Sequence, residues 1–228
     1  MYLKINSTAT ASNSGANLKK LMSRVNRKLF LVLLIAVLTA GYVQAQFTFG
    51  ARAGVNYTNM LFFVPAGSAS MGTQMQTGFQ AGVVTADRND HQVGLLIVSQ
   101  KCKFDKGSLM GFSNETLNLT YLRMPVSFLY KKDLNDMKFL LQGGFSLGLA
   151  VAGKITGEKH GEKVEEKITF AKGGMSRFDS GLGLGAGLQF GNIQTVLEYN
   201  LSYNLSNDNK VMMFNNGFAL NATYFFNK

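Results

Sequence analysis

Residues 177–191 read RFDSGLGLGAGLQFG, and this stretch decides the fold class. Apolar side chains occupy nearly every second position, and aspartate, glycine and glutamine occupy the positions between them. A β-strand points successive side chains to opposite faces, whereas a helix repeats every 3.6 residues. The stretch therefore predicts a strand with one continuous apolar face and one small, polar face.

The same alternation recurs along the chain from Gln46 onward, with no convincing helical period. It is clear in residues 47–57, 193–205 and 218–226, and looser in residues 75–85, 92–103, 117–130 and 139–152. Together with the first stretch, these segments predict an all-β chain of about eight strands.

The second face of these strands is mostly glycine, serine, asparagine and glutamine. In a soluble barrel this face would be outside and rich in charge, yet only 16% of the chain is charged. Small uncharged side chains suit a narrow barrel interior, and the apolar face then contacts lipid. We therefore expect a closed antiparallel transmembrane β-barrel in the bacterial outer membrane, with a soluble ligand-binding barrel as the less favoured alternative. Aromatic residues near the strand ends would form the interfacial girdles: Phe47, Tyr57, Tyr130, Phe178, Phe190, Tyr203, Tyr224 and Phe226.

The connections between these segments alternate in length. Residues 87–90, 133–136 and 191–192 are short, whereas residues 61–72, 105–114, 153–173 and 207–216 are longer. Outer-membrane barrels have short periplasmic turns and long outer loops, which predicts the orientation. The mixed charges of residues 158–167 predict a solvated hairpin above the membrane, with a docking surface for another protein as the alternative.

The first 45 residues have the features of a targeting segment. Residues 29–40 (LFLVLLIAVLTA) are too short for a transmembrane helix but suit a signal peptide, with cleavage expected before Gln46. A conventional signal peptide begins at Met22, so residues 1–21 are interpreted as a non-native or untranslated extension, residues 22–45 as the signal peptide and residues 46–228 as the barrel. A retained anchor followed by a soluble domain is the alternative.

The net charge of +10 resembles that of nucleic-acid-binding proteins, but six of the 23 basic residues and none of the 13 acidic ones precede Ala45. The rest of the chain has 17 basic and 13 acidic residues, and its basic residues form no stripe. No nucleic-acid partner is therefore expected. Cys102 is the single cysteine, which excludes an intramolecular disulfide and is interpreted as a spare thiol.

Several short segments resemble the PorT-like outer-membrane β-barrel proteins of Bacteroidetes. They are residues 49–56 (FGARAGVN), 99–101 (SQK), 121–126 (YLRMPV), 143–144 (GG) and 197–200 (LEYN). The resemblance covers most of the chain after the signal peptide and departs at Leu95 and Arg123, where members often carry acidic or polar residues. It implies the fold and the location, and the namesake of the family is an accessory of protein secretion, which is an analogy for function.

The sequence offers no catalytic constellation, and no cofactor or metal site is expected. His91 and His160 fall at opposite ends of the expected barrel and are interpreted as solvated surface residues. Nucleotide-binding motifs are absent, because the glycines of residues 181–187 alternate within a strand. A barrel enzyme is therefore the least favoured function.

Four charged residues fall on faces assigned to the barrel interior: Arg52, Arg123, Asp179 and Glu198. Charge in a narrow interior is costly unless it is paired. We therefore hypothesise an internal ion-pair network that fills the interior and holds the strands in register. The expected function is a structural or secretion-accessory barrel whose expected partners are outer-membrane lipid and another envelope or secretion protein, and a small passive pore is the alternative.

Overall fold

The computed structural model describes residues 47–63, 73–104, 112–168, 170, 176–205 and 212–226. The predictions for residues 1–45, namely the extension and the signal peptide, lie outside this part of the chain. No helix within it is long and apolar enough to cross a membrane. Its elements are β1 (Thr48–Phe63), β2 (Thr73–Ala86), β3 (His91–Phe104), β4 (Ser113–Leu134), β5 (Met137–Lys159), β6 (Glu162–Lys167), β7 (Phe178–Phe190), β8 (Ile193–Leu205) and β9 (Met212–Phe225).

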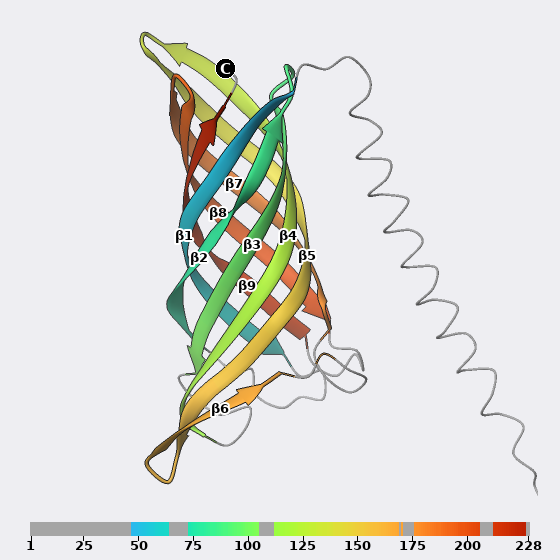
Figure 1. Ribbon diagram of the computed structural model, residues 1–228, viewed down its shortest axis with the longest axis vertical. Coiled ribbons are helices and arrows are strands. Elements are labelled where there is room, and N and C mark those ends of the chain that lie inside the picture. The colour runs from blue at the N-terminus through green and yellow to red at the C-terminus, as the bar shows by residue number, and fades with distance from the viewer. Residues whose placement is uncertain are drawn as a thin grey trace, which may run out of the picture. The chain divides into compact units, whose positions relative to one another are not determined.

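Eight of these strands form a closed antiparallel ring. Each pairs with its neighbours in the order β4-β3-β2-β1-β9-β8-β7-β5, and the pairing of β4 with β5 closes the ring. The tilted strands β2 to β5 lie in front of β7 and β8 in Figure 1. The predicted all-β, closed antiparallel barrel of about eight strands is confirmed.

The faces of the strands are as expected from the alternation. Leu182 and Leu184 on β7 are exposed by 67% and 69%, whereas Asp179 is exposed by 2%. On β4, Tyr121 and Arg123 are buried and Leu122 is exposed. Because the ring satisfies the backbone hydrogen bonds of its own strands, the exposed apolar face is suited to lipid.

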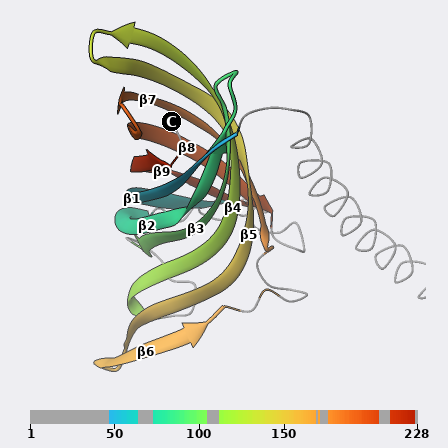
Figure 2. The same ribbon diagram turned by 45° about the horizontal axis from the view of Figure 1, so that its top comes forward.

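β4 and β5 are longer than the sequence pattern indicated. They comprise 22 and 23 residues, about twice the length that a tilted strand needs to cross a bilayer. The end of β5 leaves the ring and pairs with β6, which forms the expected charged hairpin with a turn at His160 and Gly161 (Figure 1). Figure 2 shows this hairpin beyond the ring. We call this end, where β1, β3 and β8 also end, the long-loop end.

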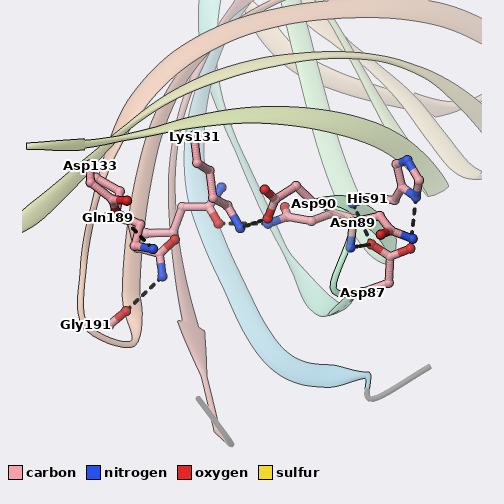
Figure 3. Close-up of polar contacts among 11 residues, drawn as sticks. Asp87, Asn89, Asp90, His91, Lys131, Asp133, Gln189 and Gly191 are labelled. Carbon is pink, nitrogen blue, oxygen red and sulfur yellow. Dashed lines mark hydrogen bonds and ion pairs between the residues drawn. The ribbon is translucent and has the colours of Figure 1, made fainter. Parts of the chain in front are cut away.

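The opposite end carries the turns at residues 87–90, 135–136 and 191–192, and we call it the short-turn end. His91 lies at this end and His160 at the other, as predicted. Figure 3 shows the polar contacts here, where the β2–β3 turn contacts β4. Asp90 pairs with Lys131, and the backbone oxygen of Asp90 accepts a hydrogen bond from the amide of Leu129 at 2.9 Å.

Candidate functional site: the filled barrel interior

The barrel interior holds a buried ion pair between Arg123 on β4 and Asp179 on β7. Arg123 Nη2 donates to Asp179 Oδ1 at 2.7 Å, and both side chains are buried. The other carboxylate oxygen, Asp179 Oδ2, accepts hydrogen bonds from Ser202 Oγ at 2.7 Å and from Asn215 Nδ2 at 3.2 Å. One carboxylate therefore joins four strands: β4, β7, β8 and β9.

Arg52 on β1 lies nearer the short-turn end and bonds to neutral partners. Its Nε donates to Thr223 Oγ1 at 3.0 Å, and its Nη2 donates to Gln92 Oε1 at 2.9 Å. Gln92 Nε2 in turn donates to Gln194 Oε1 at 2.8 Å. This chain of hydrogen bonds spans the interior from β9 through β1 and β3 to β8.

Glu198 on β8 lies between the two arginines. Its Oε2 accepts a hydrogen bond from Asn221 Nδ2 at 3.1 Å, and its carboxylate interacts electrostatically with both guanidinium groups. A cavity of about 20 Å³ is bounded by Arg52, Arg123 and Glu198. This volume holds about one water molecule, so these side chains leave no continuous channel between them.

Gly183 on β7 makes room for this arrangement. A Cβ atom at this position would lie 2.6 Å from Glu198 Oε1 and 2.9 Å from Asn200 Oδ1. The glycines that alternate along this strand thus allow larger polar side chains of β8 to occupy the interior.

The interior changes character toward the long-loop end, where it is apolar. A cluster of fully or nearly fully buried side chains fills it, including Met60, Phe62, Val98, Cys102, Leu117, Leu119, Tyr121 and Ile155. Ring stacking between Phe62 and Phe104, with centroids 5.4 Å apart, belongs to the same cluster. The sequence reasoning expected a mostly small and polar interior and missed this core. The signal was present in residues 117–121, where leucine and tyrosine share the face of Arg123.

The four predicted interior residues are thus all buried, and the structure gives them different partners. Arg123 and Asp179 form a direct ion pair, whereas Arg52 and Glu198 are held by amides and a hydroxyl. The sequence reasoning did not single out Gln92, Asn221 or Thr223. Their only signal is their position on the inward face of a strand, which neutral residues share throughout the chain.

The described residues contain no group of three or more histidine, cysteine or acidic side chains that could hold a metal ion. Cys102 is a buried free thiol within the apolar core. His91 Nδ1 contacts the carboxylate of Asp87 at 2.9 Å, and His160 is an exposed turn residue. Among the described residues, the interior side chains are thus engaged in packing and in pairing with one another.

Comparison with known proteins agrees with this architecture. The sequence model of the family described as the outer membrane protein β-barrel domain matches residues 43–208 of this chain. The chain belongs to this family. As a member of the outer membrane protein β-barrel family, it is located in the outer membrane, as the sequence predicted.

Several solved structures are similar to this family member. Neisserial surface protein A has 14% identity and a TM-score of 0.41, covering 79% of this chain and 97% of its own. A major outer membrane protein from Thermus thermophilus has 14% identity and a TM-score of 0.44, covering 79% of this chain and 100% of its own. The outer membrane protease OmpT from Escherichia coli has 8% identity and a TM-score of 0.31, covering 78% of this chain and 97% of its own. No curated protein matches the sequence significantly.

Proposed function

We propose that this protein is a non-conducting, non-enzymatic outer-membrane barrel that acts as a structural or secretion-accessory component and contacts another envelope protein. The observation that carries the proposal is the filling of the interior. Two cavities lined by its polar side chains have volumes of about 20 and 10 Å³. An eight-strand ring is just wide enough to be filled by its own side chains, which argues against a passive pore.

The accessory role is supported by the segments that resemble PorT-like proteins and by the shape of the long-loop end. β4 and β5 extend past the ring, and β6 adds a charged hairpin beyond it. Val164 packs this hairpin against the apolar core, so the hairpin has a defined place on the barrel. A surface fixed in this way can present one face to a partner.

The test is ion conductance in planar lipid bilayers, with liposome swelling in sugars as the second readout. Folded protein is expected to insert and to give no steady current above the lipid background. Insertion is checked separately, by the fraction of protein in the same liposomes that keeps its unboiled mobility on a denaturing gel. Uniform current steps that scale with the amount of inserted protein would instead support the passive pore.

A further inference from the structure

A row of three lysines and one asparagine runs across β3, β4, β5 and β6 at the long-loop end. The register places Lys101 on β3 opposite Asn118 on β4, Asn118 opposite Lys154 on β5, and Lys154 opposite Lys167 on β6. Opposed residues of antiparallel strands share a face. The row faces outward, because the flanking residues on β3 and β4 are buried inside the barrel: Gln100, Cys102, Leu117 and Leu119. We call these four paired residues the lysine row.

The lysine row lies just beyond the lipid-facing surface. Ile97 on β3 and Leu122 on β4 are exposed apolar residues that oppose each other, and each is four positions from the row. Four residues span about 13 Å along a strand, or about 10 Å along the membrane normal at the tilt usual for such barrels. Flexible lysine side chains at this distance reach the region where lipid headgroups lie.

A groove of about 690 Å³ lies beside the lysine row, where β5 turns away from β7. Its basic residues are Lys154, Lys167 and Arg177, and the apolar part of its lining includes Val151 and Phe170. The Arg177 guanidinium carbon lies 5.1 Å from the centroid of the Phe170 ring. Arg177 Nη1 also donates to the backbone oxygen of Ala150 at 3.4 Å. The groove thus combines positive charge with an apolar wall.

The positive charge of the groove is only partly balanced by the part of the chain that the structure describes. Glu165 lines the groove and accepts a contact from Lys154 Nζ at 2.8 Å, but both side chains are about half exposed, so the pair is weak. Lys167 and Arg177 form no ion pair with the described carboxylates. Lysines that directly oppose each other on adjacent strands repel, as Lys154 and Lys167 do here. An anion bound between them would remove this repulsion.

We propose that this groove binds a phosphorylated lipid of the membrane leaflet at the long-loop end. Its phosphate groups contact Lys154, Lys167 and Arg177, and one of its acyl chains lies along Val151 and Ala152. The apolar wall and the position beside the lipid-facing surface favour a lipid over a soluble anion. This inference is independent of the proposed accessory role.

The test is native mass spectrometry of the full barrel in detergent micelles that contain bis-phosphorylated lipid A. The wild-type protein is expected to retain bound lipid A. The double variant Lys154→Gln/Lys167→Gln is expected to bind it on the order of 30-fold more weakly, at roughly fivefold for each lysine near a charged membrane surface. Unchanged binding by this variant would overturn the proposal.

The matched control is Lys132→Gln/Lys138→Gln, which removes the same charge from exposed residues at the short-turn end. It is expected to bind lipid A like the wild type, and equal weakening in both variants would mean general charge attraction and no groove. Inorganic phosphate is added as a competitor. If phosphate displaces lipid A at concentrations comparable with those of the lipid, the groove binds anions in general, and the proposal that it binds a lipid is contradicted. The gel-mobility shift of unboiled protein verifies that both variants are folded.

Discussion

At the scale of single residues, Asp179 shows how an ionised group is kept inside a narrow barrel. Its carboxylate accepts hydrogen bonds from Arg123, Ser202 and Asn215, which lie on three other strands. Taking Asp179 away leaves the Arg123 guanidinium buried without its direct ion-pair partner, with Glu198 as the opposite charge that still interacts with it. The pair therefore specifies which strands lie next to this point of the interior.

We predict that Asp179→Ala lowers the free energy of unfolding by about 3–5 kcal/mol, because the Arg123 guanidinium is left buried without its direct ion-pair partner. Urea titration of the refolded protein in detergent, followed by the mobility shift on unboiled gels, measures the change. Ser202→Ala removes one hydrogen bond to the carboxylate and is the graded control, with an expected loss of about 1.5–3 kcal/mol. An Asp179→Ala protein as stable as the wild type would contradict a structural role for the pair.

At the scale of elements, the β2–β3 turn depends on one side chain. Asp87 Oδ1 accepts hydrogen bonds from the backbone amides of Asn89 at 2.9 Å and His91 at 2.8 Å (Figure 3). Asp90 in the same turn has a positive φ of 64°, a conformation that aspartate and asparagine tolerate better than most residues. The turn is therefore encoded locally, and its contact with Lys131 fastens it to β4.

The pKa of the Asp87 carboxyl follows from these contacts. Burial raises this pKa, but the hydrogen bonds from the backbone and ring of His91, the charge of that ring and the amide of Asn89 together hold it below its usual value of 3.8. A carboxyl whose pKa is depressed by folding stabilises the fold above its unfolded pKa, and this contribution is lost as the pH falls through the folded pKa. We predict that the turn keeps its hydrogen bonds until the pH falls below 3.8.

Titration of the Asp87 carboxyl carbon by NMR in detergent micelles measures this midpoint. His91→Phe keeps a ring against Phe128, from which the histidine ring centroid lies 5.2 Å, but removes the ring hydrogen bond and charge. In this variant the midpoint is expected to rise. A midpoint above 3.8 in the wild type would show that burial dominates and that the prediction is wrong.

At the scale of the whole molecule, closure of the ring determines how the protein behaves. Pairing of β4 with β5 leaves no open edge among the eight ring strands. A closed barrel with a filled interior must break many hydrogen bonds together before it can open. This cooperativity underlies resistance to detergent.

We predict that the unboiled protein from a membrane fraction migrates differently from the boiled protein on a denaturing gel. The variant Leu184→Pro serves as a comparison, because proline removes a hydrogen bond from a strand that is paired on both sides. The wild-type shift is expected to persist to a higher temperature than that of the variant. Identical mobility of boiled and unboiled wild-type protein would argue against a closed ring.

The sequence by itself determined the class of fold, the approximate number of strands and which face of each strand contacts lipid. These follow from a local rule, because alternation along one strand assigns each side chain to one of two faces. It also indicated that Arg52, Arg123, Asp179 and Glu198 lie inside. The rule that the apolar face contacts lipid fails at Leu117 and Leu119, which alternate with Asn118 and Thr120 and yet are buried, because the interior is apolar at this end.

Only the tertiary structure decided which interior residues meet. The partner of Arg123 lies 56 positions away in the sequence, and the partner hydroxyl of Arg52 lies 171 positions away. The register of several strands brings both pairs into contact. The lysine row likewise exists only because β3, β4, β5 and β6 align four distant positions. A single strand carries no information about the register of its neighbours. The contacts between interior residues are therefore set only when the strands pair and the ring closes.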